Sequence, residues 1–256
     1  DSDWDLGGAQ RYSSGAAHNK QIYNTLAVGY ALPWFGLRVG LSGVIIHQVI
    51  DSKVALSLDN GINNWKSEDP DFDATVHLLA KQEWIRNAAI SILAQPWSPI
   101  KLLLHYQFHY DVHATGKAAI TLGDEVSGVA KITGERLKMH LKMPGIFRAA
   151  IGYVMPSKRM DIELAYVWEN WARNEVIWVV PQDITMEALG KTQPLKPIPL
   201  KTHFRDSYSL RLGASYDLLP AKFKVRAGTY LERGAAAESW TSAGTLGLNI
   251  FGISIG

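Results

Sequence analysis

The sequence predicts an all-β protein, an antiparallel up-and-down transmembrane β-barrel with long strands. Three observations support this: apolar and polar residues alternate over long stretches, the connections alternate between short and long, and aromatic residues gather near the short ones. A barrel strand crosses a bilayer with alternation alone, whereas a membrane helix needs about 20 consecutive apolar residues. No window of the chain offers such a run, so a helical membrane protein is excluded.

The longest alternation covers residues 136–155. Its odd positions from Leu137 to Met155 are mostly apolar, and its even positions are basic, small or apolar. A period of two held over about twenty residues predicts one very long strand, because a helix would spread these residues around its circumference. We expect the apolar face to meet lipid and the other face to point into the lumen. The cations on the expected lumenal face are Arg136, Lys138, His140, Lys142 and Arg148.

Similar alternation predicts about nine strands and the start of another at Phe251. In chain order we expect them at 22–32, 37–57, 73–95, 100–113, 136–155, 159–180, 206–217, 222–231 and 239–250. Further cations expected to face the lumen are Arg211, Lys222, Lys224 and Arg226.

The connections between these strands are of two kinds. Short ones, such as those around Pro33, Pro96 and Pro156, each contain a proline, which suits a tight reversal. Long ones are expected at 58–72, 123–134 and 181–204, the last with a short helix over 184–190 that ends at a glycine. Short periplasmic turns and longer extracellular loops are typical of outer-membrane barrels. The aromatics beside the short turns, which would form the periplasmic girdle, are Tyr30, Trp34, Trp97, Tyr153 and Tyr216.

Composition excludes several other classes of protein. The absence of Cys excludes a disulfide scaffold and a thiolate metal site, and 26 basic against 24 acidic residues, spread along the chain, do not form the basic cluster of a nucleic-acid binder. No nucleophile and base are grouped as catalysis requires, so we expect neither an enzyme nor a cofactor. A soluble β-sandwich is the alternative fold, but its strands would be about half as long.

Two successive segments carry a distinctive pattern. LKMPGIFRAAIGY at 141–153 is a strand with a Pro before a Gly-Tyr, and DIELAYVWENW at 161–171 is a strand with a Tyr-x-x-x-x-Trp pattern. Together they resemble the FadL family of outer-membrane transporters for long-chain fatty acids and other hydrophobic molecules. The segment FRDSYSLRLGASY at 204–216 is also similar to later strands of the family. The resemblance, which covers about 135–250, implies passive uptake of fatty acids or hydrocarbons across the outer membrane.

The family barrel has about fourteen strands and an N-terminal plug marked by Asn-Pro-Ala, a motif that this sequence lacks. We therefore expect residues 1–256 to form a single but incomplete barrel domain, without the plug and the first and last strands, or a barrel completed by other chains. An open sheet in lipid would leave backbone groups unpaired.

The lumenal cations listed above are the candidate ligand-binding residues. The resemblance implies that they pair with a fatty-acid carboxylate while apolar groups hold the tail; alternatively, they balance inward acids such as Asp161 and Asp217 in a polar lumen. Pro144 removes a ladder hydrogen bond, so Pro144 and Gly145 predict either a bulge or, by the resemblance, a strand break for sideways exit of ligand into the membrane.

Two alternatives stay open. His109, Asp111 and His113 hold a metal only if neighbouring strands add ligands, so we expect no metal site. A FadL-fold barrel could instead be a structural or partner-binding subunit of an outer-membrane assembly such as a secretion machine. Its lumen would then be filled by bulky side chains, and it would bury roughly 1,000 Å² or more against a protein partner of the envelope. The partners that we expect otherwise are membrane lipid and a hydrophobic small molecule.

Overall fold

The computed structural model describes residues 2–3, 12, 15–57, 69–157, 159–219, 222–237, 239 and 247–256. Its main strands in chain order are β1 (Ser2–Asp3), β2 (Ala16–Ala31), β3 (Arg38–Ser57), β4 (Asp73–Trp97), β5 (Ile100–Gln107), β6 (Tyr110–Leu122), β8 (Arg136–Met143), β9 (Ile146–Val154), β10 (Met160–Glu169), β11 (Val176–Pro181), β14 (Ile198–Lys201), β15 (Ser207–Leu219), β16 (Phe223–Arg233) and β17 (Ile250–Ile255). These form one antiparallel sheet. The remaining elements are η2 (Pro70–Phe72), α1 (Asp124–Ser127), β7 (Ala130–Thr133), η3 (Trp171–Arg173), β12 (Thr185–Ala188) and β13 (Lys191–Pro194). Within the described ranges, no helix is long and apolar enough to cross a bilayer.

Several strands are two halves of one longer strand. β5 and β6 keep the same register on β4, and β8 and β9 keep the same register on β5 and β6, across the interruptions at 108–109 and 144–145. β10 and β11 follow the same course on either side of η3, and β14 and β15 do so on either side of residues 202–206. The predicted succession of long antiparallel strands is therefore present. The strand expected at 239–250 falls mostly outside the described residues, and β17 starts at Ile250.

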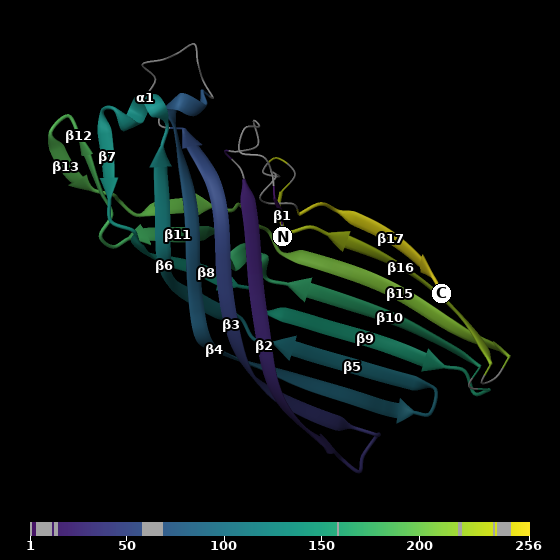
Figure 1. Cartoon of the computed structure of the whole chain (residues 1–256). Helices are drawn as coiled ribbons and strands as arrows, with labels where there is room; N and C mark the ends of the chain where they lie inside the picture. The colour runs from purple at the N-terminus through teal and green to yellow at the C-terminus, as the bar shows by residue number, and fades with distance from the viewer. Residues whose placement is uncertain are drawn as a thin grey trace.

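The interruptions divide the sheet into two halves, as Figure 1 shows. The turn half contains β5, β9, β10, β15, β16 and β17 with the adjoining parts of β2, β3 and β4, and it ends at the short turns. The loop half contains β6, β8, β11 and β14 with the remainder of β2, β3 and β4. Among the described strands, β2 pairs beyond β3 only with the short β1, and β17 forms the far edge of the turn half.

In the turn half, apolar side chains cover the face that we call the outer face. A single cross-strand row on it is apolar throughout: Tyr30, Val39, Ile92, Leu104, Ala149, Tyr166, Leu210, Leu231 and Phe251. These side chains are mostly exposed, whereas Ser207, Ser209 and Ser215 on the opposite, inner face are less than 10% exposed. Large exposed apolar residues facing away from buried serines are typical of a lipid-facing wall.

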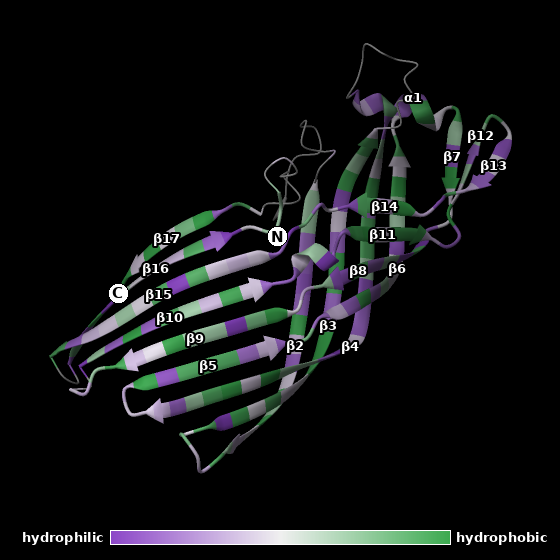
Figure 2. Cartoon of the chain, turned by 180° about the vertical axis from the view of Figure 1, so that it is seen from behind, coloured by the Kyte–Doolittle hydropathy of each residue, from purple (hydrophilic) through white to green (hydrophobic). Residues whose placement is uncertain are grey.

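The apolar face changes sides between the two halves. In the uninterrupted strand β3, Val39 and Leu41 on the outer face are exposed, but farther along the same strand the buried apolar residues are Val44 and Ile46 on the inner face. Hydropathy colouring in Figure 2 shows the mixture of apolar and polar residues along these strands. The loop half thus buries apolar side chains on its inner face, as a water-soluble protein does, and its outer face is mostly polar, with exposed apolar exceptions such as Val49 and Leu79.

Strands other than β3 achieve the same change by a local irregularity. β4 has one extra residue opposite β3 around Trp84, whose φ is +65°, and such a bulge exchanges the two faces of a strand. In β5–β6 the interruption after Gln107 has the same effect, so Tyr106 is outer and Tyr110 is inner and buried. Pro144 and Gly145 have this effect between β8 and β9.

A hydrophobic core therefore lies on the inner face of the loop half. Its members come from β3, β4, β6 and β8, and Ile184 beyond β11 packs on them. The core residues with the lowest exposure are Ile46, Ala80, Val112, Ala114 and Leu137.

The segment 184–190 is a strand and turn rather than the expected short helix. β12 pairs with β13 through a turn at Leu189 and Gly190, which both have positive φ. Such angles at two successive residues match a tight hairpin turn, and β7 pairs with the other edge of β12. The glycine that was expected to end a helix instead closes a hairpin.

Candidate functional site

The inner face carries two adjoining pockets where the strands are interrupted; together we call them the mid-height hollow. One, of about 550 Å³, is lined by β2, β5, β6, the Pro144 break and the end of β10. The other, of about 350 Å³, extends from β10 and η3 to β15, β16 and β17. Both are lined by Glu169 and Trp171, which join them.

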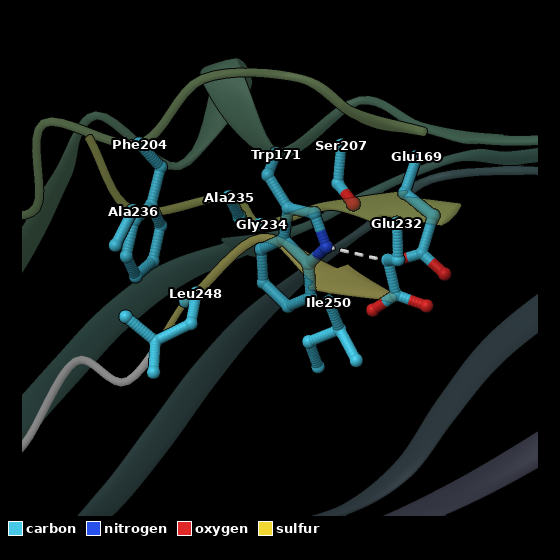
Figure 3. A pocket seen from close by; sticks show the side chains of 11 residues that line it. Glu169, Trp171, Phe204, Ser207, Glu232, Gly234, Ala235, Ala236, Leu248 and Ile250 are labelled. Carbon is cyan, nitrogen blue, oxygen red and sulfur yellow. Dashed lines mark hydrogen bonds between the residues drawn. The ribbon is translucent and has the colours of Figure 1, made fainter. Parts of the chain in front are cut away.

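Trp171 and its neighbours form the wall between the two pockets. β10 ends at Glu169, and the chain then turns through η3, so the Trp171 indole comes back over the end of the strand. The indole Nε1–H donates a hydrogen bond to Glu169 Oε2 at 2.7 Å, which Figure 3 shows as a dashed line. The ring of Trp171 packs edge-on against Phe204 at 5.8 Å between centroids. The wall is therefore aromatic with one fixed carboxylate.

The opposite wall of the hollow is formed by two tyrosines. Tyr23 of β2 and Tyr110 of β6 bring their hydroxyl groups to 3.2 Å, although β3 and β4 lie between their strands. The pair lies on the inner face, where Ile46 is fully buried. Met143 and Ile146, on either side of the strand break, complete this lining.

The charged side chains that line the hollow are acidic. Glu169 and Glu232 line it, and no Lys, Arg or His of the described residues does so. Glu232 faces Arg211 across the β15–β16 ladder, with its carboxylate 3.7 Å from the guanidinium. An aromatic and apolar cavity with a few placed polar groups is the usual form of a small-molecule site.

The structure divides the expected stripe of lumenal cations between the two faces. Arg136, Lys138, His140 and Lys142 lie on the outer face of the loop half, because Leu137, Met139 and Leu141 fill the inner core. The expectation that these four face the lumen is therefore corrected. Arg148 lies on the inner face of the turn half.

The other candidate cations lie on the inner face of β15 and β16, or in the turn before β16. Arg211 also donates a hydrogen bond to Ser209, Lys224 is 3.5 Å from Asp217, and Arg226 follows on the same face. Lys222 is an exposed turn residue. Ligand binding by any of these residues stays a prediction.

Pro144 and Gly145 lie between β8 and β9 and are buried. Residues 108–109 opposite them are also outside the ladder, so pairing is interrupted on this side. A Cβ on Gly145 would lie 2.8 Å from the hydroxyl oxygen of Tyr106, which shows that this ring covers the break. A side chain at position 145 would therefore require the Tyr106 hydroxyl group to shift.

The histidines of β5 and β6 do not form a metal site in the described part of the chain. No group of three or more His, Cys, Asp or Glu there is arranged to hold an ion. His113 Nδ1 instead lies 2.7 Å from His140 Nδ1, and Arg173 contacts Asp111 at 3.0 Å.

The comparisons with known proteins agree with this architecture. No protein-family model and no curated relative matches the chain. Among solved structures, a FadL homologue from Pseudomonas aeruginosa has a TM-score of 0.77 at 13% identity, covering 99% of this chain and 58% of its own. The CymD monoaromatic hydrocarbon channel has a TM-score of 0.61 at 15% identity, and the match covers 86% of this chain and 61% of CymD. The Ralstonia pickettii toluene transporter TbuX has a TM-score of 0.60 at 14% identity, and the match covers 84% of this chain and 56% of TbuX.

The chain therefore has the fold of FadL-type β-barrels, as the sequence resemblance implied. It spans about three fifths of the length of these structures.

Of the residues that line the mid-height hollow, the sequence indicated Pro144 as a possible strand break, but it did not identify the aromatic and acidic lining residues as a site. Trp171 is the tryptophan of the Tyr-x-x-x-x-Trp pattern, but alternation places no ligand near it. Tyr23 and Tyr110 are 87 residues apart, and only the strand order brings them together.

Proposed function

We propose that the protein is part of an outer-membrane channel for the passive uptake of neutral hydrophobic molecules of hydrocarbon type. The observation that carries this is the mid-height hollow, which is aromatic and apolar, and whose charged lining residues are the carboxylates of Glu169 and Glu232. The outer apolar face of the turn half would contact lipid, and the inner face would line the passage. Passage through such a lumen needs no covalent chemistry.

The charge of the hollow favours a neutral ligand over a fatty acid. A fatty-acid carboxylate in the hollow would lie close to Glu169, and two carboxylates in a partly desolvated site repel each other. Arg211, a nearby inner cation, already pairs with Glu232. The similar structures include proteins described as a monoaromatic hydrocarbon channel and a toluene transporter, which agrees with a neutral ligand.

The proposal requires that the edges at β2 and β17 be paired in the membrane. Further strands of the same protein or another chain would provide the pairing, since unpaired backbone groups in lipid cost several kcal/mol each. The hollow also supports a channel over a purely structural subunit, whose lumen would be filled with side chains.

The break at Pro144 and Gly145 offers a route from the hollow toward lipid. Met143, Pro144 and Ile146 line the hollow, and the ladder is interrupted at the same point. In this structure the Tyr106 side chain covers Gly145, so sideways exit would require that ring to move.

The test compares uptake of toluene and of a long-chain fatty acid by liposomes that contain the full protein. Toluene should enter faster than through liposomes without protein, and Ile146→Trp, which fills the hollow, should reduce that protein-dependent rate about tenfold or more. Ile162→Trp is the matched control, because it places the same side chain on the outer face of β10. Equal toluene uptake by the Ile146 variant and wild type, or uptake of the fatty acid alone, would contradict the proposal.

A further inference from the structure

The outer face of the loop half carries a band of cations that the channel function does not use. We define the cationic band by its seven exposed members, Lys20, Lys81, Arg86, Lys117, Arg136, Lys138 and Lys142. Three of them lie in a single cross-strand row in which Lys20 pairs with Val49, Val49 with Lys81, Lys81 with Thr115, and Thr115 with Lys138. Members of one row share a face of the sheet.

The band begins immediately beyond the apolar wall. On β4, Ile90 belongs to the apolar outer face and Arg86 is the first cation, paired with Ile45 of β3. Two exposed tryptophans lie beside members of the band: Trp84 packs edge-on against His47 near Arg86, and Trp178 lies opposite His140 in the β8–β11 ladder. Tryptophan is enriched where hydrocarbon meets headgroups, so the band lies at the height of lipid headgroups.

Part of the band surrounds a groove of about 620 Å³. Lys81, Lys117, Arg136 and Lys138 line it, and none of its lining residues is acidic. Three of these cations contact acids beside the groove: Lys81 with Glu83 at 3.6 Å, Arg136 with Asp183 at 2.6 Å, and Lys117 with Glu135.

Those pairs do not prevent the cations from binding a stronger anion. All three cations are about 70% exposed in their side chains, and exposed ion pairs contribute little stability, so a phosphate can share or replace the acids. Lys20, Arg86, Lys138 and Lys142 form no ion pair with any residue that the structure describes. Of these, Lys138 also lines the groove, and Lys142 lies on the same face of β8.

We propose that the cationic band binds the phosphate groups of a lipid headgroup in the outer leaflet of the membrane. This inference rests on the outer-membrane placement in the proposed function. A lipid suits the position better than a free anion, because its acyl chains would lie along the apolar outer face while its phosphates reach Arg86, Lys142 and the groove above them. Basic clusters beside a membrane surface recognise anionic headgroups in this way.

The experiment measures binding of lipid A with two phosphates to the full protein in detergent by native mass spectrometry. The comparison ligands are the same lipid A without phosphates and inorganic phosphate. The test variant is Lys138→Gln with Lys142→Gln; the matched control is Lys131→Gln with Lys191→Gln, two equally exposed lysines on the separate small sheet of β7, β12 and β13. A heat-dependent shift of gel mobility verifies that each variant is folded.

Binding of phosphorylated lipid A should weaken about fivefold per lysine, or roughly thirtyfold in the test variant, and remain unchanged in the control. Equal affinity for the dephosphorylated lipid, equal losses in both variants, or a comparable affinity for inorganic phosphate would overturn the proposal. Toluene uptake measured on the same variants separates the two proposals. Intact uptake with unaltered lipid binding refutes only the lipid site, whereas absent uptake in wild type refutes the channel.

Discussion

Replacing Leu212 with arginine tests whether the outer face of the turn half contacts lipid. Leu212 lies on β15 midway between Tyr208 and Tyr216, and its side chain is 46% exposed. Leu79 on β4 is the matched position, since it is an outer-face leucine of the loop half and 49% exposed. The two substitutions remove similar contacts, so the difference between them reports the surrounding medium.

The expected magnitudes differ clearly. Arginine on the lipid face near the bilayer midplane costs about 2–4 kcal/mol, and Leu212 is four residues from a tyrosine on each side, near the middle of the apolar wall. At Leu79 the arginine would stand outside the hydrocarbon, at the groove of the cationic band, between Asp51 and Lys117, one attractive and one repulsive neighbour, so a change within about 0.5 kcal/mol is expected.

Reversible urea unfolding in phospholipid vesicles measures both free energies. Leu212→Arg should lower the free energy of unfolding by several times as much as Leu79→Arg. Equal losses at the two positions would refute the assignment of hydrocarbon to one half of the outer face and a polar medium to the other.

Three further predictions follow from the change of sides and from the core of the loop half. Because the chain has no native Cys, a membrane-impermeant maleimide applied to intact cells should label Lys53→Cys and leave Leu41→Cys unlabelled; equal labelling would contradict the membrane boundary. Burial and the neighbouring His113 and Lys138 lower the pKa of His140 in the folded protein. The unfolded chain therefore binds a proton at His140 more readily than the folded chain, so the part of the free energy of unfolding that is present above about pH 6.5 should be lost as the pH falls. The urea midpoint should therefore fall less between pH 7.5 and 5.5 in His140→Gln than in wild type, and an unchanged loss would exclude this cause. Gly116→Ala should lower the free energy of unfolding by about 1–3 kcal/mol in the same titration, because its Cβ would clash with the β4 backbone; a neutral effect would refute the close approach.

The strand pattern of the fold was predictable because alternation and turn residues are local signals. The short turns after Ala31, Trp97 and Val154 fall where the prolines indicated them, and the exposed aromatics beside them lie as predicted. The face of β15 was also predictable, since Tyr208 and Leu210 keep one side along an uninterrupted strand.

The faces of the loop half could not be predicted from alternation. The numerical period of residues 136–155 is preserved across Pro144 and Gly145, yet the chain turns over there, so Leu141 is inner and Phe147 is outer. At Trp84 the sequence gives no indication of a bulge. A pattern of period two reports that a strand has two faces but not which one meets lipid.

The candidate site was predictable only in part. Inner-face cations such as Arg211 were found from their strands, but the mid-height hollow is formed by residues brought together by strand order and by the turn of η3. Glu169 belongs to the segment that carried the family resemblance, and its role follows only from the hydrogen bond with Trp171.

The most direct test of the account is a crystal structure of the full protein soaked with iodobenzene, whose iodine is located by its anomalous signal. We expect iodine in the mid-height hollow, between the Trp171 wall and the Tyr23–Tyr110 pair, with Glu169 still accepting its hydrogen bond from Trp171. Iodine found only on the outer face, with the hollow empty or filled by protein side chains, would contradict the channel.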